Sequence, residues 1–432
     1  MLDRREFFGT LARPAGVALA VAALDTARAR AAVRELAATP GTPDAIAADE
    51  AYWSVVQRAF AVDRSLINLN NGGVSPSPTV VQDAMRRYLE FSNQAPAYTM
   101  WKVLEPGRET VREALARTLG CDAEEVAITR NTSESLQACQ LGFDLAPGDE
   151  VLTTTQDYPR MVTTFKQMER RYKIVLRQFK VPTPLEDPSE AVRLFESNIT
   201  DRTRMILISH MVFLTGQVMP VREVARLGAA RGIPVIVDGA HSFAHLDYKI
   251  SDLECDYFGT SLHKWLHAPH GTGLLFVRKA KIPSVWPLMA APPELDGNIR
   301  KFEEIGTHPA ANALAVGEAL SFYGGIGAKR KETRLRYLRD RWVTRLQATG
   351  KVKLFTNLKP GWSGGIATFG LDGVDPAALE KTLWDKHRIF VVTIKHEEVV
   401  GTRVSPSVYT TVDEIDRFGD AVEDFIRKGA AA

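Results

Sequence analysis

The sequence predicts an α/β protein with a large domain built on a mostly parallel β-sheet and a second, smaller α+β domain. Two observations predict this class. Short β-branched runs alternate with amphipathic helical segments over most of the chain after residue 50, which is typical of parallel sheets with helices on both faces. The 432 residues are also 45% hydrophobic and 25% charged, which is enough apolar material for two domains with substantial cores.

Local patterns assign the helices of the large domain. The first is expected to begin at Pro78, with Ser77 as its cap. Its apolar face is formed by Val81, Ala84, Met85 and Tyr88. A second helix, about 106–119, ends at Gly120, and a crossover helix is expected over Pro220–Arg231.

Six short runs rich in β-branched residues are expected to be strands. They are Val126–Thr129, Val151–Thr154, Ile174–Leu176, Met205–Ser209, Val235–Asp238 and Leu274–Val277. Because helical segments separate most of them, we expect a mostly parallel sheet with both faces covered.

From about residue 311 the pattern changes to longer helices. One stretch, Lys329–Arg345, is rich in Arg, and Thr411 and Glu414 have the spacing of a capping box that opens a last amphipathic helix.

These changes of pattern give the expected boundaries. Residues 31–50 are an Ala-, Thr- and Pro-rich spacer, and residues 51–78 are an N-terminal segment that joins the small domain. The large domain is expected at 79–310 and the small domain at 311–432.

The first thirty residues have the pattern of an export signal. Arg4 and Arg5 precede a mildly apolar run that continues to Leu24, and Ala27-Arg28-Ala29 matches the A-x-A pattern of a cleavage site. The Arg pair resembles a twin-arginine signal. We therefore expect residues 1–30 to be removed and the protein to be periplasmic and free of the membrane; the alternative is an ordinary N-terminal helix and a cytoplasmic location.

Charge and cysteine content exclude several classes of protein. Lys and Arg total 54 against 52 for Asp and Glu, and the body of the chain has no basic stripe, so nucleic-acid binding is not expected. Cys121, Cys139 and Cys255 lie far apart without a CxxC pair. Neither a disulfide framework nor a zinc–thiolate cluster is therefore expected.

The strand Val235–Asp238 ends in a carboxylate, followed by Gly239, Ala240 and His241. Ligands of open α/β sheets bind at the carboxyl ends of strands. A half-buried acid at this position needs a cationic or hydrogen-bonding partner, and a protonated heterocyclic nitrogen would serve. The simpler interpretation is that Asp238 only caps the next helix.

Lys264 lies in the segment 260–265, among apolar and aromatic residues. A Lys in such surroundings loses its proton readily and acts as an amine nucleophile. Ser261 and His263 flank it. The simpler interpretation is a surface Lys whose stem covers apolar neighbours.

Thr132 and Ser133 follow the strand Val126–Thr129 and begin a helix. Hydroxyls and free N–H groups at a helix start form an anion site. In isolation they are better explained as a capping cluster. Together, however, an anion site, a carboxylate for a ring nitrogen and an amine for an aldehyde describe one ligand, pyridoxal 5′-phosphate.

At this point the sequence resembles the class V aminotransferases, which have fold type I among pyridoxal-phosphate enzymes, and within them the isopenicillin N epimerase-like branch. The resemblance covers about residues 65–427. It is carried by the D-G-A-H and S-x-H-K arrangement from Asp238 to Lys264, supported by Asn70-Asn71-Gly72, Asn131-Thr132-Ser133, Gly306-Thr307 and Arg403-Val404-Ser405-Pro406. It implies a seven-stranded sheet in the large domain, which then binds the cofactor.

The resemblance also implies roles for single residues. Lys264 is implied to be the Schiff-base lysine and general acid/base, and Asp238 the partner of the ring nitrogen. Further cofactor contacts are implied for Thr132, Ser133, Tyr158, His241, Ser261 and His263, with Tyr158 stacked on the ring. Phe213 stands where many family members have a polar side chain, so a hydrogen bond to the ring oxygen is either missing or supplied by Thr215.

The substrate and a partner subunit are implied in the same way. Arg403 matches the arginine that binds the substrate carboxylate, and Asn70 and Tyr98 are expected to contribute to the substrate pocket. Thr307 matches a residue that reaches the phosphate of the neighbouring subunit, which implies a homodimer with shared active sites.

The expected reaction proceeds through an external aldimine and removal of the α-proton from a small-molecule amino substrate. Transamination is the first expectation; epimerisation and elimination are alternatives. No Cys follows Cys255, so the persulfide mechanism of cysteine desulfurases lacks its nucleophile. A remote alternative is a metal hydrolase that uses the run His263, His267 and His270.

Overall fold

The structure, a computed structural model, describes residue 31 and residues 33–428. The expected export signal at residues 1–30 therefore lies outside the described residues. Among the described helices, none is long and apolar enough to cross a membrane.

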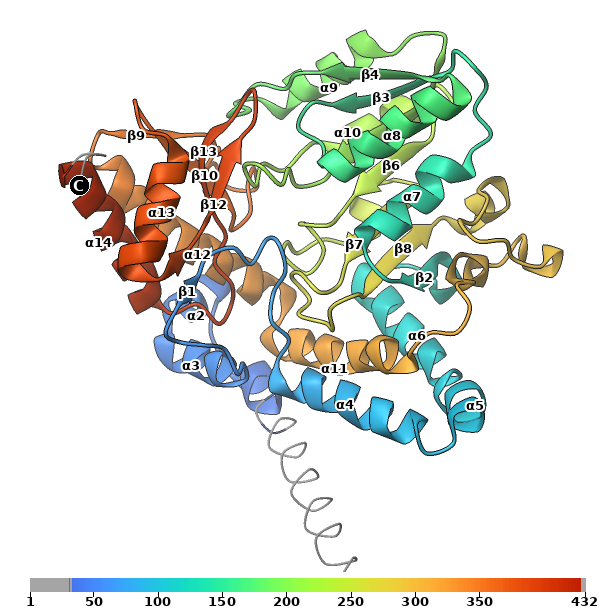
Figure 1. Cartoon of the computed structure of the whole chain (residues 1–432), viewed down its shortest axis with the longest axis horizontal. Helices are drawn as coiled ribbons and strands as arrows, with labels where there is room; N and C mark the ends of the chain where they lie inside the picture. The colour runs from blue at the N-terminus through green and yellow to red at the C-terminus, as the bar shows by residue number, and fades with distance from the viewer. Residues whose placement is uncertain (1–30, 32, 429–432) are drawn as a thin grey trace, which may run out of the picture.

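A seven-stranded sheet forms the centre of the large domain, on the right of Figure 1. Its strands are β2 (Val126–Thr129), β3 (Glu150–Thr154), β4 (Val175–Phe179), β5 (Thr203–Ser209), β6 (Val235–Asp238), β7 (Tyr257–Ser261) and β8 (Gly273–Val277). The order is β2-β8-β7-β6-β5-β3-β4. Only β8 runs antiparallel to its neighbours in this sheet, so the predicted, mostly parallel sheet is confirmed.

Successive residues of the central strands enter two different core clusters. In β5, Leu207 packs into one cluster, while Ile206 and Ile208 pack into the other. This follows from the two-residue period of a strand, and it explains why the strands read as continuous apolar runs. The covering helices are α6 (Gly107–Leu119), α7 (Thr132–Gly142), α8 (Pro159–Tyr172), α9 (Pro188–Asn198) and α10 (Val221–Ala229).

Helix α4 (Thr79–Ser92) packs along α11 (Ala310–Ile326) at the bottom of Figure 1. Val81 and Ala84 are fully buried there, as the predicted apolar face requires. The predicted cap is wrong. The helix has Pro78 at its cap position without a side-chain hydrogen bond, and the Ser77 hydroxyl instead donates to the carbonyl of Ala268 at 3.0 Å.

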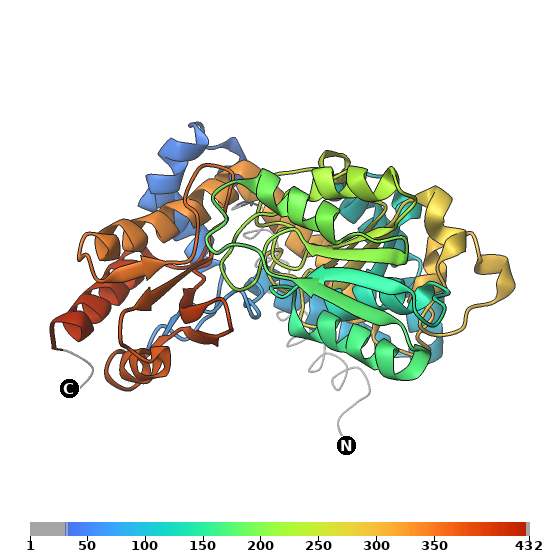
Figure 2. The same cartoon turned by 90° about the horizontal axis from the view of Figure 1, so that it is seen from above.

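The small domain lies to the left in Figure 2 and has an antiparallel sheet of four strands in the order β12-β13-β10-β9. They are β9 (Val352–Leu354), β10 (Ala367–Leu371), β12 (Val392–Lys395) and β13 (Val400–Val404). Its helices are α12 (Ala328–Gln347), α13 (Pro376–His387) and α14 (Val412–Lys428). At the start of α14, Glu414 N donates to the Thr411 hydroxyl at 3.0 Å and Thr411 N to the Glu414 carboxylate at 2.8 Å, the predicted capping box.

The N-terminal segment reaches the same domain. Strand β1 (Ile67–Asn68) pairs in parallel with β11 (Ile389–Phe390), and Asn70 then bridges to Ser405. This pairing brings the Asn70–Gly73 turn to the C-terminal strands, beside the strand ends of the large sheet.

Residues 31–50 differ from the expected spacer because they contain helical structure. Helix α2 (Pro43–Ala48) is capped by Thr42, begins with Pro43 and packs against α12 with Ile46 buried; α3 (Glu50–Arg58) follows. The Thr and Pro that suggested a linker are here a cap and a first-turn residue.

Candidate active site

The carboxyl ends of the central strands border a cavity of about 560 Å³. Both domains and the N-terminal turn contribute to it. The lining includes Gly72, Gly73, Thr132, Ser133, Tyr158, Arg160, Met211, Phe213, Asp238, His241, Ser261, His263, Lys264, Val392, Ile394 and Arg403. Most of the residues that the sequence singled out are therefore brought together.

Asp238 ends β6 in the middle of the sheet and is 4% exposed. Its carboxylate accepts one hydrogen bond, from Ala240 N at 2.9 Å. Burial raises the pKa of Asp238 to about 6, while the Ala240 hydrogen bond and the Lys264 charge lower it. A buried carboxylate with one neutral donor can accept a further cationic partner, as the pyridine nitrogen of the predicted cofactor would be.

Lys264 lies in the loop after β7, the strand next to β6. Its Nζ lies 3.2 Å from Nε2 of His241 and 5.9 Å from the centre of the Tyr158 ring. Burial lowers the pKa of Lys264 to about 8, with Asp238 opposing this effect and Arg403 adding to it. Burial also holds the pKa of His241 well below its usual value, so this imidazole is neutral.

The start of α7 gives the cavity an anion site. Asn131 caps α7 by accepting from Glu134 N at 2.9 Å. The Ser261 hydroxyl accepts from Thr132 N at 3.0 Å and lies 2.6 Å from the Thr132 hydroxyl. A helix N-terminus with two hydroxyls suits a phosphate group. His263 also lines the cavity, but its Nδ1 contacts the carbonyl of Thr272 at 3.0 Å.

Arg403 is held by segments far apart in the sequence. Its guanidinium donates to the carbonyl of Phe213 and to Oδ1 of Asn70, both at 2.9 Å. Neither acceptor is charged, and burial lowers the pKa of Arg403 to about 10, so it remains a cation near neutral pH. The Phe213 ring meets the Tyr158 ring edge to face, with centres 5.4 Å apart. Asn70 therefore orients Arg403 and is not among the residues that line the cavity.

Besides Asn70, three predicted residues do not line this cavity within the chain. The Thr215 hydroxyl accepts from Gln217 N at 3.3 Å inside its own turn, so the structure does not support a cofactor contact. Tyr98, in the short helix α5 (Pro96–Tyr98), is 66% exposed. Thr307 is exposed and lines a different hollow, together with Trp101.

Asp157 is a buried carboxylate that sequence reasoning missed. It accepts five hydrogen bonds: from the hydroxyl groups of Thr153, Thr154 and Ser209, and from the backbone N–H groups of Thr154 and Ser209. Asp157 thus ties the end of β3 to the end of β5. Its position directly before Tyr158, just after a strand, was the available signal.

The histidine run does not form a metal site. His263 contacts the Thr272 carbonyl, His267 packs edge to face on Phe60, and His270 contacts the carbonyl of Ser75. Across residues 33–428, no group of three or more His, Cys, Asp or Glu is placed to hold a metal ion.

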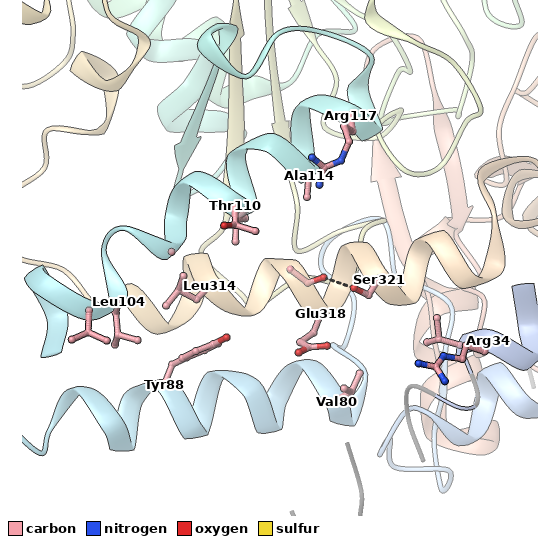
Figure 3. Close-up of a pocket in the computed structure, with 15 residues that line it drawn as sticks. Arg34, Val80, Tyr88, Leu104, Thr110, Ala114, Arg117, Leu314, Glu318 and Ser321 are labelled. Carbon is pink, nitrogen blue, oxygen red and sulfur yellow. Dashed lines mark hydrogen bonds between the residues drawn. The ribbon is translucent and has the colours of Figure 1, made fainter. Parts of the chain in front are cut away.

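A larger hollow of about 840 Å³ lies between α4, α6 and α11, away from the strand ends (Figure 3). Figure 3 shows Tyr88, Leu104 and Leu314 along one part of it, with Glu318 and Arg117 further along. Its titratable side chains are Arg34, Tyr88, Arg117 and Glu318, with no Lys or His among the described residues that line it. We therefore assign the active site to the strand-end cavity around Lys264.

The family model described as aminotransferase class V matches residues 67–418. The chain belongs to this family. It is 30% identical over 393 residues to isopenicillin N epimerase of Streptomyces clavuligerus, covering 86% of this chain and 98% of the relative. It is 25% identical to a probable cysteine desulfurase of Halalkalibacterium halodurans, covering 83% of this chain and 92% of the relative.

Solved structures share the fold. The apo structure of a cysteine desulfurase from Thermococcus onnurineus superposes with a TM-score of 0.77 at 22% identity, covering 87% of this chain and 98% of that chain. A C-DES mutant with glycine covalently linked to its pyridoxal-phosphate cofactor gives 0.76 at 22% identity, covering 85% and 99%. This protein is thus a class V pyridoxal-phosphate enzyme of fold type I.

The cavity fits that cofactor. The hydroxyls of Thr132 and Ser261 at the start of α7 would hold the phosphate, Asp238 would face the ring nitrogen, and Lys264 would hold the aldehyde. His241 Nδ1 is buried without a hydrogen-bond partner and is available to a polar atom of the ring. When bound, pyridoxal phosphate supplies an aldehyde for amines and a ring that withdraws electrons from the α-carbon of an amino acid.

Proposed function

We propose that this protein removes the α-proton of an amino acid with Lys264 and returns a proton to the opposite face, so that the net reaction is epimerisation. The observation that carries the proposal is the pair of proton-bearing groups in the cavity, Lys264 and Tyr158, with the Lys264 Nζ 5.9 Å from the Tyr158 ring centre. The named activity of its 30% identical relative from Streptomyces supports the same reaction class.

Lys264 is suited to take up a proton near neutral pH. Its lowered pKa of about 8 leaves part of the population as the free amine, and a base with a pKa near the working pH is the most effective. The neutral His241, 3.2 Å away, supplies an acceptor that fixes the direction of the amine. Arg403 then holds the α-carboxylate through its remaining donors.

Transamination requires only Lys264, which would deliver the proton to the cofactor instead of to the substrate. It is the expected outcome if Tyr158 carries no proton to the substrate.

The persulfide chemistry of cysteine desulfurases is not proposed, because the sequence has no Cys after Cys255. Burial raises the pKa values of Cys121, Cys139 and Cys255 to about 12, with nearby acidic groups adding to this for Cys121.

The test uses single enantiomers of amino acids in D₂O. We expect α-deuteration together with formation of the opposite enantiomer, measured by mass spectrometry and chiral chromatography. Tyr158→Phe should retain deuteration and lose inversion, whereas the control Tyr172→Phe, at the far end of α8, should retain both. Formation of an α-keto acid without inversion would establish transamination and overturn the epimerase proposal.

The attachment of the cofactor has its own test. We expect borohydride to fix pyridoxal phosphate to the peptide that contains Lys264, detected by its added mass after proteolysis. A protein that remains colourless and unlabelled after incubation with pyridoxal phosphate would contradict the role of Lys264.

We also propose a homodimer in which Thr307 reaches the partner's phosphate site. The resemblance to the family suggested it, and the exposure of Thr307 and of the nearby Trp101, which is 56% exposed, supports it. Mixing the inactive variants Thr307→Tyr and Lys264→Ala should restore part of the activity, because one site in each heterodimer is then intact. No recovery, with heterodimers confirmed by native mass spectrometry, would place each site within one subunit.

Export by the twin-arginine route is proposed from Arg4 and Arg5. That route carries folded proteins, so a cofactor bound in the cytosol would travel with its enzyme. Fractionation of cells that produce the wild type and an Arg4→Lys/Arg5→Lys variant tests the proposal. A full-length wild-type protein in the cytosol would contradict it.

A further inference from the structure

Arg160 is a cation in the lining of the cavity that the reaction does not use. It occupies the first turn of α8, two residues after Tyr158, and its side chain is exposed to the cavity mouth. Among the described residues, its guanidinium makes no hydrogen bond or ion pair, in contrast to Arg403.

The charges of the cavity are not balanced. Its lining contains three permanent or partial cations, Arg160, Lys264 and Arg403, and a single carboxylate, Asp238. Lys264 and Asp238 are committed to the cofactor, and Arg403 to the α-carboxylate of an amino acid. Of the anionic groups that the cofactor and a simple amino acid bring, only the cofactor phosphate is then left as a partner for Arg160.

The backbone of Arg160 is set back from the phosphate end of the cavity. Gln140 donates to the carbonyl of Met161 at 3.0 Å, so the start of α8 packs against the later part of α7. Gln140 is eight residues beyond Thr132 on that helix, or about 12 Å along its axis. The anion site begins at Thr132, so the base of the Arg160 side chain is set well back from it.

Arg160 and Arg403 both adjoin a surface of aromatic and apolar residues in the cavity lining. The Phe213 carbonyl holds Arg403, the Phe213 ring meets Tyr158, and Arg160 follows Tyr158 by two residues. Val392 and Ile394, which alternate on β12, add to the same lining. An apolar chain that lies on this surface, with an anionic group at each end, would satisfy both guanidinium groups.

We propose that Arg160 selects amino acids whose side chain ends in a carboxylate or an equivalent anion. This inference rests on the proposed function, because it assumes that Arg403 binds the α-carboxylate of a substrate at Lys264. Arg160 is then a specificity residue that acts on the far end of the substrate and has no part in proton transfer.

Binding measured by isothermal titration tests the proposal. The cofactor-loaded protein in the Lys264→Ala background, which prevents turnover, is titrated with L-glutamate and L-norvaline and with the longer pair 2-aminohexanedioate and L-norleucine. The members of each pair have equal chain length and differ in the distal carboxylate. We expect at least one diacid to bind about tenfold or more tightly than its neutral partner, a preference of about 1.4 kcal/mol.

Arg160→Gln should abolish that preference by weakening the diacid alone, and Arg160→Lys should retain part of it. The control Arg170→Gln, an exposed position in the last turn of α8, should change neither ligand. Equal weakening of acidic and neutral ligands, or no change at all, would overturn the role of Arg160. If borohydride labels Lys264 in the wild type but no amino acid binds, the cofactor assignment stands and both the proposed function and the role of Arg160 are contradicted. If Lys264 is not labelled, the cofactor assignment itself is contradicted.

Discussion

Two regions of this molecule bury charged side chains and differ in how they pair them. Between α6 and the segment Ile299–Glu303, Arg108 and Arg112 both donate to the Glu303 carboxylate, which also accepts from Ile128 N at 2.6 Å. In the strand-end cavity, Lys264, Asp238 and Arg403 contact only neutral groups of the described chain. Asp238 and Arg403 are as deeply buried as Arg108 and Arg112, so the difference lies in pairing.

Whether a buried charged side chain has a counter-ion within the protein distinguishes a structural charged group from a functional one. A buried ion without a counter-ion destabilises the folded chain, whereas a fully hydrogen-bonded group is retained at little net cost. The α6 region pairs Arg108 and Arg112 with the buried Glu303 carboxylate. The cavity leaves a carboxylate, an amine and a guanidinium to be satisfied by a ligand, which is the arrangement expected of a binding site.

Lys264→Ala is the strongest test of this comparison. We expect turnover to fall by about four orders of magnitude, because the substitution removes both the amine nucleophile and the proton acceptor. The free energy of unfolding of the cofactor-free protein should be unchanged or higher, since a half-buried cation without a hydrogen-bonded counter-ion is removed. Steady-state kinetics and urea unfolding measure the two effects, and a large loss of stability would mean that Lys264 is a structural charge.

Glu303→Ala is the converse change in the paired region. Arg112 is 1% exposed at its side chain and would lose its buried counter-ion. We expect the free energy of unfolding to fall by about 3–5 kcal/mol. Glu304→Ala is the matched control, since Glu304 is exposed and makes no ion pair among the described residues. Equal effects of the two substitutions in urea unfolding would remove the distinction between the regions.

The same distinction explains what the sequence could predict. Asp238 ends one of the six predicted strands and Thr132 follows another, and parallel strands bring such ends to one edge. Lys264 follows β7, which was not among the predicted strands, and was instead indicated by its apolar and aromatic neighbours. The large sheet and the centre of the site were therefore predictable from local pattern. The helices of residues 31–50 were not, because capping residues and linker residues are the same residue types.

Contacts between distant segments were also beyond local pattern. Nothing near Arg403 in the sequence indicates that Asn70 and the Phe213 carbonyl orient it, and this arrangement depends on the pairing of β1 with β11. Thr215 was assigned to the cofactor by its place in a turn, but the direction of a hydroxyl depends on the hydrogen bond available to it, here from Gln217 N. Asp157 was missed because five hydrogen bonds from two strands define it.

Asp238→Asn tests the comparison through the pH dependence of the free energy of unfolding. Burial raises the pKa of Asp238 from 3.8 to about 6, so the folded protein binds this proton more tightly than the unfolded chain. The stability that the proton contributes is complete below about pH 4 and is lost as the pH rises through about 6. Without cofactor, Asp238→Asn should therefore lack a fall in stability of about 2–3 kcal/mol between pH 4 and 7.

Asp157→Asn is the control for that experiment. Its carboxylate is satisfied by five donors, and an amide nitrogen would face some of them, so stability should fall by about 1–3 kcal/mol at neutral pH. Urea unfolding across the pH range distinguishes the two variants. If Asp238→Asn also destabilised the protein at neutral pH, Asp238 would be a structural carboxylate of the same kind as Asp157.

Arg403→Lys is the smallest expected effect and tests whether orientation matters beyond charge. The guanidinium is fixed by two neutral acceptors, the Phe213 carbonyl and Asn70 Oδ1. An ammonium keeps the positive charge but cannot hold both contacts and also bind a carboxylate in two places. We expect KM for an amino acid to rise about tenfold, or about 1.4 kcal/mol, with kcat changed by less than about threefold.

Arg341→Lys is the control, because Arg341 forms a surface ion pair with Asp416, and it should leave KM unchanged. A loss confined to kcat would instead show that Arg403 acts on the reacting atoms, and the division between substrate binding at Arg403 and proton transfer at Lys264 would no longer hold.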